Sequence, residues 1–419
     1  GPTKKTMARF FCCVNLLLVG SLLASRDEKD CYVDDLTSRK YPLSLDEVFK
    51  LSKAKELRHM RSGTSPRKAP GASMGVKFRN FRRQQLEIRW DDGSKEGTYS
   101  GVVQGLGRTA TMSYVGHRFK FLDPSTREEV ASFTMRDGQN IYVVEPVEDD
   151  VLKSAAYAES QREVAFMRDY EERTGYPWLS FYPRDPPFLN MWPAEAVGQT
   201  HVVASTYGYN VTTGAGAPLA LRLVALSHPP KGPRVFLIED LLSDFECDHI
   251  LALGKKVVQE SRVGQNGGFK SKTRTSANGW LRRSASPVLD HVYKRFGDAL
   301  GIDDALLVPS KNAEELQVVR YDPSQEYAPH HDFGDDGTPQ QRFLTLLLYL
   351  QPADQGGATS FPKAFDNMGL QVVPHRGDAV LFYNMLPDGN SDDLALHAGM
   401  PVLKGQKWVC NLWVWDPHR

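Results

Sequence analysis

The chain has 419 residues, too many for one ordinary hydrophobic core, and its length predicts two or three domains. Hydrophobic residues make up 41% and charged residues 24%, which argues against a disordered chain or a membrane-embedded one. Lys plus Arg and Asp plus Glu number 51 each, so no overall charge favours nucleic acid as a partner.

A basic lead, then an apolar run from Phe10 to about Ala24, opens the chain. Small residues and then charges follow, which is the layout of a secretory signal peptide, and the run is short for a membrane span. We therefore expect residues 1–25 to be a leader, with GPTKKT as a tag remnant at its start. It predicts a location in the lumen of the endoplasmic reticulum or Golgi. An uncleaved anchor is the alternative, and only then would the membrane be a partner.

The cysteines and one short motif bear on the same compartment. The five cysteines are Cys12, Cys13, Cys31, Cys247 and Cys410. The three beyond the leader form neither a disulfide framework nor a zinc pattern, although one bridge is compatible with a secretory compartment. The triplet NVT at 210–212 is an N-glycosylation acceptor pattern, which is consistent with secretion.

Residues 26–75 are predicted to hold a helix and a linker. Ser44 and Glu47 form a capping box that opens an amphipathic helix, and a segment rich in Pro, Gly and Ser follows at 61–75. From 76 to 149, short alternating segments separated by turn signals predict a small β-sandwich.

Residues 150–233 are predicted to connect that sandwich to a last domain. Residues 150–174 have the pattern of one helix that ends at Gly175. The segment 176–195 contains too much Pro and too many aromatic residues for a helix or strand. Gly- and Pro-rich stretches between 212 and 233 indicate a final linker.

Strands dominate the last predicted domain, 234–419. A strand and a capping box at 234–246 lead into one helix, and Ser286 begins another. After Leu316 nearly every segment has strand character. The sequence therefore predicts an α+β chain that is mainly β, with helices laid against the last domain's strands.

The stretch QEYAPHHDFGDD (325–336) carries the first candidate site residues. Side chains alternate along a strand, so His330 and Asp332 point the same way, whereas His331 faces away and is expected to be dispensable. His-x-Asp is two thirds of the facial triad that binds non-haem Fe(II), and the triad needs a second His from elsewhere. Alone the pair is a weak signal, since most His and Asp residues are ordinary surface groups. The candidate third ligand is His397.

Lys407 follows His397 by ten residues, in KGQKW. A buried lysine there could bind an anionic co-substrate, because a desolvated carboxylate requires a matched cation. The alternative is an exposed lysine on a strand, which is where most lysines lie.

Several motifs then occur together, in order: YDPSQEYAPHHD, GGATSFPKA, GLQVVPHRGDAVLFYN and LHAGMPVLKGQKWVCNLWVW. Over about 234–416 they resemble the catalytic domain of 2-oxoglutarate/Fe(II)-dependent prolyl 4-hydroxylases of the collagen and plant/algal type. The resemblance implies a double-stranded β-helix (jelly-roll) domain with the metal in its mouth. It also implies C4 hydroxylation of peptidyl proline with Fe(II), 2-oxoglutarate, O2 and ascorbate, which releases succinate and CO2.

The family's functional residues carry over by position. The resemblance implies that the Fe(II) ligands are His330, Asp332 and His397. It implies that Lys407 pairs with the distal carboxylate of 2-oxoglutarate and that Tyr321 and Thr359 hydrogen-bond this co-substrate. The residues implied for the peptide site are Arg274, Ser276, Tyr327, Arg342 and Trp413, of which Arg342 and Trp413 are also the catalytic candidates. Core or rim packing is the alternative for the aromatic residues.

One position departs from the family. Ala358 stands where the motif GGET commonly has Glu, so a peptide contact is expected to differ. The expected partner remains a proline-containing peptide or protein. Two alternatives stay open: hydroxylation of another residue such as lysine, and a binding protein with a decayed oxygenase domain. Lys407, rather than Arg, favours the prolyl type.

Residues 76–146 are similar to the β-domain of the von Hippel–Lindau tumour suppressor, a module that recognises hydroxyproline in a peptide. Trp90, Ser113 and His117 align with residues that cradle the hydroxyproline ring and its hydroxyl. Phe119 stands where that family has a second Trp. The resemblance implies an accessory domain that holds the product. The alternative is a plain sandwich in which Trp90 is a core residue.

Overall fold

The computed structural model describes residues 73–416 except 95, 137–138, 181, 183, 215, 261, 264–268, 271–275 and 334–340. The predicted leader, the helix from Ser44, the following linker and Arg274 lie outside these residues. Within the described part of the chain, no helix combines the length and apolar character that crossing a membrane requires.

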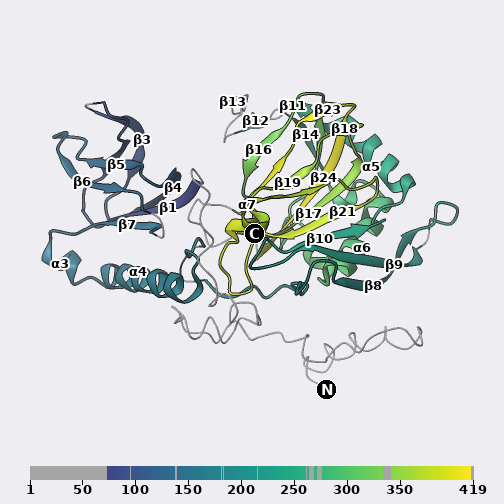
Figure 1. Ribbon diagram of the computed structural model, residues 1–419, viewed down its shortest axis with the longest axis horizontal. Helices are drawn as coiled ribbons and strands as arrows, with labels where there is room; N and C mark the ends of the chain where they lie inside the picture. Colours follow the sequence, from purple (N-terminus) through teal and green to yellow (C-terminus); the bar gives the residue numbers. More distant parts are fainter. Residues whose placement is uncertain are drawn as a thin grey trace, which may run out of the picture. The chain divides into compact units, whose positions relative to one another are not determined.

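Seven strands form two sheets that pack around a shared core (Figure 1). One sheet has the order β4-β1-β7: β4 (Arg108–Tyr114), β1 (Ser73–Asn80) and β7 (Ile141–Val144). The other has the order β3-β2-β5-β6: β3 (Thr98–Val103), β2 (Leu86–Trp90), β5 (Arg118–Leu122) and β6 (Glu129–Thr134). In the core, the ring of Phe78 meets those of Phe119 and Phe121 edge to face, with centroids 5.5 and 5.0 Å apart. This geometry is favourable for aromatic pairs.

The helix expected at 150–174 is two helices, α3 (Asp149–Leu152) and α4 (Ala155–Thr174). The break is at Ser154, whose side chain accepts a hydrogen bond from the backbone N–H of Tyr157 and so caps the start of α4. The predicted end is correct: Gly175 adopts φ 78°, a left-handed conformation that glycine reaches without a steric penalty.

The segment after α4 has neither helix nor strand among its described residues up to 199, as its composition predicts. It is nevertheless tightly bonded to a loop after β21. Asn390 Oδ1 accepts hydrogen bonds from the backbone N–H groups of Leu179 (2.7 Å) and Ser180 (3.2 Å). The hydroxyl of Tyr170 in α4 donates to Asp388 Oδ2 at 2.6 Å. These buried polar groups are paired, as buried polar groups generally must be.

A nine-stranded antiparallel sheet is the main element of the rest of the chain, in the order β11-β14-β15-β24-β17-β21-β10-β9-β8. The strands are β11 (Gln259–Glu260), β14 (Ala277–Leu281), β15 (Leu316–Tyr321), β24 (Lys407–Asp416), β17 (Gln341–Gln351), β21 (Ala379–Tyr383), β10 (Val235–Glu239), β9 (Gly216–Ser227) and β8 (Thr200–Tyr209).

The prediction of a linker between 212 and 233 is wrong in one respect, because most of this segment forms a strand. β8 and β9 form a hairpin, and β9 pairs with β10. Leu221, Leu223 and Ala225 are fully buried and alternate with more exposed residues, so the hairpin covers part of the core. The Gly- and Pro-rich stretches make its turns.

A four-stranded sheet, in the order β16-β22-β19-β20, completes the double-stranded β-helix. Its strands are β16 (Tyr327–His330), β22 (His397–Gly399), β19 (Thr359–Phe361) and β20 (Leu370–Val372). Two short pairs, β12 (Arg262–Val263) with β13 (Phe269–Lys270) and β18 (Gln355–Gly356) with β23 (Val402–Lys404), lie outside both sheets, and α7 (Ala364–Asn367) follows β19.

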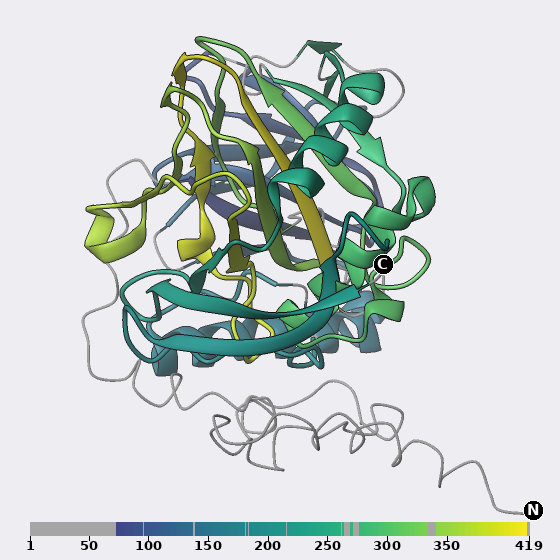
Figure 2. The same cartoon turned by 90° about the vertical axis from the view of Figure 1, so that its right-hand side faces the viewer.

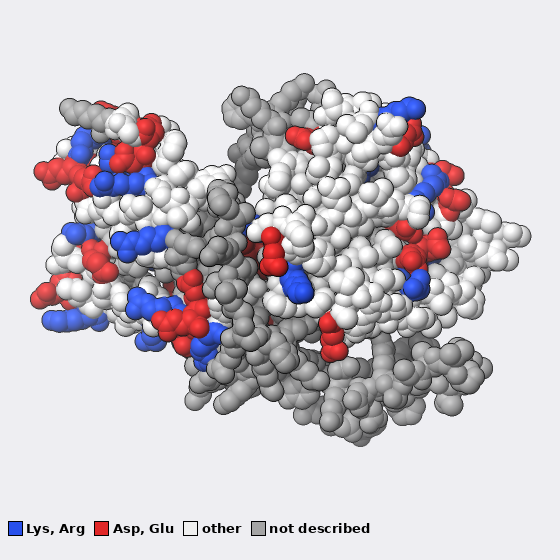
Figure 3. Space-filling model, in the orientation of Figure 1, with Lys and Arg blue, Asp and Glu red and all other residues white. Residues whose placement is uncertain are grey.

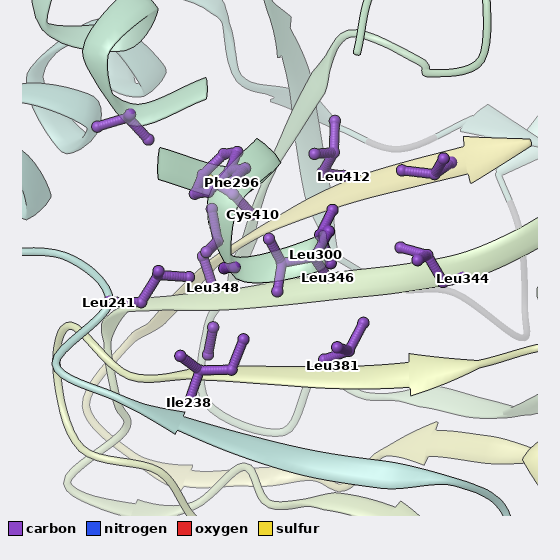
Figure 4. Close-up of a cluster of buried hydrophobic side chains, with 14 of the residues drawn as sticks. Ile238, Leu241, Phe296, Leu300, Leu344, Leu346, Leu348, Leu381, Cys410 and Leu412 are labelled. Carbon is purple, nitrogen blue, oxygen red and sulfur yellow. The ribbon is translucent and has the colours of Figure 1, made fainter. Parts of the chain in front are cut away.

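Helices α5 (Asp244–Val257) and α6 (Pro287–Leu300) cover one face of the large sheet (Figures 1 and 2). The predicted capping box is confirmed, since Ser243 and Glu246 bond reciprocally at the start of α5. Alternate residues of β17 serve two cores. Leu346 and Leu348 pack toward the helices (Figure 4), whereas Leu347 and Tyr349 belong to the core with residues of the smaller sheet. The barrel interior therefore receives the odd-numbered face of β17.

Charges of both signs are interspersed on the face drawn in Figure 3, in keeping with the balanced composition. Cys247 and Cys410, the two cysteines within the described residues, are buried and free.

Candidate active site

The three predicted metal ligands converge where β16 and β22 pair. His330 and His397 are Cα partners across these strands, and Asp332 follows shortly after β16. His330 Nε2 lies 3.7 Å from Asp332 Oδ1, and His397 Nε2 lies 3.6 Å from Asp332 Oδ2. One ligand atom from each residue lies within 4.8 Å of the other two. His330 and Asp332, which are close in sequence, thus form a spatial cluster with His397.

Both imidazoles are oriented by a backbone carbonyl two residues earlier. Nδ1 of His330 donates to the carbonyl of Ala328 at 2.9 Å, and Nδ1 of His397 donates to that of Ala395 at 3.0 Å. A carbonyl only accepts, so each Nδ1 carries the hydrogen and each Nε2 is the nitrogen suited to bind a metal. The ring of Tyr327 stacks on His330 with centroids 3.6 Å apart.

Asp332 is held by two donors on one oxygen. The hydroxyl of Thr345 and the indole N–H of Trp413 donate to Oδ2, at 2.7 and 2.9 Å. The amide of Asn384 in turn donates to the Thr345 hydroxyl at 3.0 Å. Burial alone would raise the pKa of Asp332, but the neighbouring His397, His330 and Arg342 hold it well below its usual range.

The donor set suits a specific metal. Two imidazole nitrogens and one carboxylate form the facial set that binds non-haem Fe(II) and leaves positions open. Hydrogen bonds to the far side of each ligand fix its orientation, as they do in metal sites generally. The residues present therefore fit Fe(II).

Lys407 is a buried lysine with no counter-charge among the described residues. It is 3% exposed, and no carboxylate or hydrogen-bond acceptor among the described residues pairs with its ammonium group. Burial lowers the pKa of Lys407 to about 7. Its Nζ lies 5.6 Å from the ring centroid of Tyr321 and 5.1 Å from that of Tyr349. A buried unpaired ammonium is costly, so this one is suited to an anionic ligand.

The other predicted co-substrate residues surround the same space. Tyr321 is directly opposite Lys407 in the β15–β24 pairing, and both are buried. Thr359 pairs with Gly399, two residues after His397, and its hydroxyl bonds the phenol of Tyr349. Gly357 keeps room for the lysine, because a Cβ there would lie 3.3 Å from Lys407 Cδ and its φ is +69°.

The predicted catalytic pair, Arg342 and Trp413, forms one stack. The Arg342 guanidinium lies 3.8 Å from the Trp413 ring centroid, and its NH1 is 4.0 Å from Asp332 Oδ1. Arg342 also donates from Nε to Glu314 at 2.7 Å, and the indole of Trp415 donates to the same carboxylate oxygen at 3.0 Å. Trp413 is therefore bound directly to a candidate metal ligand, which the sequence did not predict.

The remaining peptide-site candidates are less clustered. Ser276 is buried directly before β14, whose first residue Ala277 pairs with Arg320. Ala358, the departure from the family motif, is also buried. The predicted role of Arg274 falls on a residue outside the described part of the chain.

Sequence reasoning missed Thr345 and Asn384, which orient Asp332. Thr345 had a signal, since it is the polar residue inside the apolar run FLTLLLYL. His331 is not part of the metal cluster, and it is largely buried rather than a surface residue. Its side chain is 8% exposed and Nε2 donates to the carbonyl of Asp393 at 3.1 Å, while burial lowers its pKa to about 4.

The three candidates in the amino-terminal sandwich also come together. The ring of Trp90 lies 5.2 Å from that of His117, centroid to centroid, and Ser113 Oγ is 3.2 Å from His117 Nδ1. Ser113 is buried, whereas Trp90 and His117 are each half-buried. Trp90 is thus accessible in part rather than a fully enclosed core residue.

Comparison with known proteins agrees with this geometry. The model of the 2OG-Fe(II) oxygenase superfamily matches residues 316–415. Probable prolyl 4-hydroxylase 8 of Arabidopsis thaliana is 35% identical over 43% of this chain and 68% of its own length. Prolyl 4-hydroxylase 5 of the same plant is 37% identical with the same coverage.

An animal protein and a solved structure also match. Prolyl 4-hydroxylase subunit alpha-1 of Gallus gallus is 35% identical over 43% of this chain and 36% of its own length. The crystal structure of a viral collagen prolyl hydroxylase from Paramecium bursaria chlorella virus 1 is 30% identical over 43% of this chain and 95% of that one, with a TM-score of 0.35. With the triad geometry and the plant relatives, the conclusion is that this chain belongs to the prolyl 4-hydroxylase family of 2-oxoglutarate/Fe(II) oxygenases.

Proposed function

We propose that the chain hydroxylates C4 of proline in a peptide or protein, with Fe(II), 2-oxoglutarate and O2 as co-reactants and succinate and CO2 as co-products. One observation carries the proposal: the His330, Asp332 and His397 cluster lies in the same barrel as the buried Lys407, which has no carboxylate partner among the described residues. A domain that had lost its oxygenase activity would not be expected to retain a buried lysine without a partner, since burial of that charge is costly.

The three ligand residues would hold Fe(II). Bound Fe(II) supplies the oxidising chemistry by reducing O2 at the expense of 2-oxoglutarate. His330 and His397 present Nε2 because their Nδ1 atoms are committed to carbonyls, and Asp332 presents Oδ1 because Thr345 and Trp413 occupy Oδ2.

Lys407 would bind the distal carboxylate of 2-oxoglutarate. A charge-assisted hydrogen bond in a dry site is stronger than one in water, and it would hold the lysine in its charged form. Tyr321 and Thr359 lie beside Lys407 and near His397, so their hydroxyls would complete the carboxylate's hydrogen bonds.

The peptide would lie against Tyr327 and the Arg342–Trp413 stack. Tyr327 stacks on His330, and the Arg342 guanidinium lies over the Trp413 ring. Both surfaces are flat and partly apolar, which suits a proline ring. Ser276 and Arg274 are the further peptide contacts that the family pattern suggests.

The secretory lumen is the location we propose, supported by the leader pattern at residues 1–25.

Ascorbate is proposed as the reductant that keeps the iron in the Fe(II) state between turnovers. Loss of activity without ascorbate, regained when it is added, would support that role, and full activity in its absence would exclude it.

The proposed reaction is tested by mass spectrometry of proline-containing peptides after incubation with the purified chain, Fe(II), 2-oxoglutarate and ascorbate. We expect one added oxygen on proline, with no addition by His330→Ala. Lysine-containing peptides in parallel reactions address the rival activity. Oxygen on lysine and none on proline would replace our proposal with the lysyl one.

A second function is favoured by the cluster in the amino-terminal sandwich. We propose that Trp90, Ser113 and His117 bind hydroxyproline: the Trp90 ring would contact the pyrrolidine, and Ser113 with His117 would bond its hydroxyl. One chain would then make the product and hold it, which raises the local concentration of a substrate with several prolines.

Peptide affinity of the whole chain tests this second function. Hydroxyproline peptides should bind more tightly than matched proline peptides in a His330→Ala background, which prevents turnover. The preference should disappear in Ser113→Ala. Equal affinity for the two peptides would refute hydroxyproline recognition.

A further inference from the structure

The 3-10 helix η7 (Asp393–Ala395) directly precedes the strand that carries His397, and hydrogen bonds hold both of its ends. At its last residue, the carbonyl of Ala395 accepts the Nδ1–H of His397 at 3.0 Å. At its first residue, the carbonyl of Asp393 accepts from His331 Nε2 at 3.1 Å. One turn of helix therefore links His331 to the imidazole of His397.

The side chain of Asp393 adds a second anchor. Lys363 Nζ bonds Asp393 Oδ1 at 2.7 Å, and His331 Nε2 lies 3.5 Å from the same oxygen. His331 precedes Asp332, Lys363 follows the strand of Thr359, and Asp393 precedes His397. Three chain segments that each carry a site residue thus meet at one carboxylate.

We propose that His331, Lys363 and Asp393 form a clamp that positions the His397 imidazole for Fe(II) binding. The proposal rests on the assignment of His330, Asp332 and His397 as the iron ligands. The three clamp residues are positioning residues, since they act through η7 and through the Ala395 carbonyl.

The expected effect of the clamp is on iron affinity. If Asp393 shifts, the Ala395 carbonyl shifts with it, and the His397 ring loses the hydrogen bond that aims Nε2. Loss of a group that orients a metal ligand typically costs about 10- to 100-fold in metal affinity. Global stability should fall less than on loss of a fully buried ion pair, because the Lys363 and Asp393 side chains are 10% and 22% exposed and stay partly solvated.

The clamp is tested with His331→Phe, which keeps a flat ring and removes the N–H, and with Lys363→Met. The Fe(II) concentration for half-maximal proline hydroxylation should rise about tenfold or more in each variant. Turnover at saturating Fe(II) and the thermal midpoint of the metal-free protein should stay close to wild type. His331→Gln restores an N–H donor and should recover most of the iron affinity.

Two exposed residues provide matched controls, His375→Phe and Lys404→Met, because the His375 side chain is 96% exposed and Lys404 is exposed. An unchanged iron requirement in His331→Phe and Lys363→Met would overturn the clamp. So would parallel losses of iron affinity and thermal midpoint that His331→Gln does not rescue. Where His331→Phe fails to fold, Lys363→Met decides.

The results expected if the proposed function is wrong differ from those expected if only the clamp is wrong. Wild-type protein would then show no iron-dependent hydroxylation, and His397→Ala would bind Fe(II) as wild type does in a direct titration.

A separate observation concerns the tip of the β8–β9 hairpin. Asn210, Val211 and Thr212 form the one Asn-x-Ser/Thr triplet of the chain, and all three are exposed. Asn210 Oδ1 accepts hydrogen bonds from the backbone N–H groups of Thr212 (2.9 Å) and Thr213 (3.1 Å). No hydrogen bond among the described residues uses Nδ2 of Asn210, which leaves this nitrogen available for modification.

We infer that Asn210 is N-glycosylated, an inference that rests on the proposed secretory location. The donor class is an oligosaccharide linked to a lipid diphosphate. A bond forms between Asn210 Nδ2 and C1 of the first sugar as the C1–O bond to the diphosphate breaks. The diphosphate leaves with that electron pair, and the amide nitrogen loses one proton.

The test uses the full chain expressed in eukaryotic cells. Enzymatic removal of N-glycans should increase the electrophoretic mobility of the wild type and leave that of Asn210→Gln and Thr212→Ala unchanged. Thr213→Ala, outside the triplet, should keep the glycan. A chain that is protected from protease in the lumen but carries no glycan would overturn the modification alone. A chain exposed in the cytosol would overturn the location together with it.

Discussion

The indole N–H of Trp413 donates a 2.9 Å hydrogen bond to Oδ2 of Asp332, the oxygen that also accepts from Thr345. Trp413 lies on β24 and Asp332 follows β16, so the bond joins the two sheets of the barrel at the metal cluster. Besides its proposed place in the peptide site, Trp413 therefore orients the carboxylate of Asp332.

Trp413→Phe should weaken iron binding. The variant keeps an aromatic ring under Arg342 and removes only the N–H, so Asp332 loses one of its two orienting donors. We expect the Fe(II) concentration for half-maximal activity to rise about tenfold. Trp280→Phe is the control, since Trp280 is 41% exposed and its ring centroid is 6.0 Å from that of Trp413. An equal rise in the control would remove the specific role of the Trp413–Asp332 bond.

Lys407→Met should raise the Kd for 2-oxoglutarate, measured by calorimetry with Mn(II) in place of Fe(II). A bound carboxylate left without its cation costs about 2–5 kcal/mol, which corresponds to a rise of at least about 30-fold. Lys404→Met, at an exposed position, should leave the Kd unchanged. A wild-type Kd in Lys407→Met would show that the anion binds elsewhere.

The affinity for 2-oxoglutarate should also fall as pH increases above about 7. The pKa of Lys407 in the ligand-free protein is about 7, so at higher pH binding must take up a proton to restore the ammonium. Calorimetry at about pH 8 in buffers of different ionisation enthalpy should therefore reveal proton uptake in wild type. The same titration without uptake would contradict a lowered Lys407 pKa.

The lowered pKa of Lys407 also predicts how the stability of the folded protein depends on pH. Its pKa is about 7 when folded and near 10.5 when unfolded, so the unfolded chain binds more protons between these values. The free energy of unfolding of the ligand-free protein should therefore rise with pH across this window as the buried charge is neutralised. Urea unfolding of wild type and Lys407→Met should show this contribution in wild type alone. A difference between the two proteins that is independent of pH would contradict it.

The buried ion pair between Arg295 of α6 and Glu246 of α5 should dominate local stability. Both side chains are almost fully buried, and Arg295 also donates to the carbonyls of Leu241 and Tyr207. Arg295→Met leaves Glu246 buried without its partner, which costs about 3–5 kcal/mol. Arg222→Met, which removes the exposed pair with Glu239, should cost less than about 1 kcal/mol. Urea unfolding compares the two, and similar losses would refute the role of burial.

Local signals in the sequence were sufficient for much of the fold and for two of the three residues of the metal cluster. The capping box at Ser243 and Glu246 and the end of α4 at Gly175 depend on neighbouring residues alone, so they were predictable. His330 and Asp332 also share a short local spacing. The grouping of His397 and Lys407 with these residues came from the family pattern, because only the pairing of distant strands brings them into the same barrel.

Tertiary structure decided the rest, since it depends on contacts between residues far apart in the chain. Pairing of β9 with β10 turned an expected linker into part of the large sheet. The bonds from Thr345 and Trp413 to Asp332 join residues 13 and 81 positions away in sequence. The sequence alone determined which residues can bind iron and an anion, while the folded barrel decided what orients them, because orientation requires donors that only packing brings within reach.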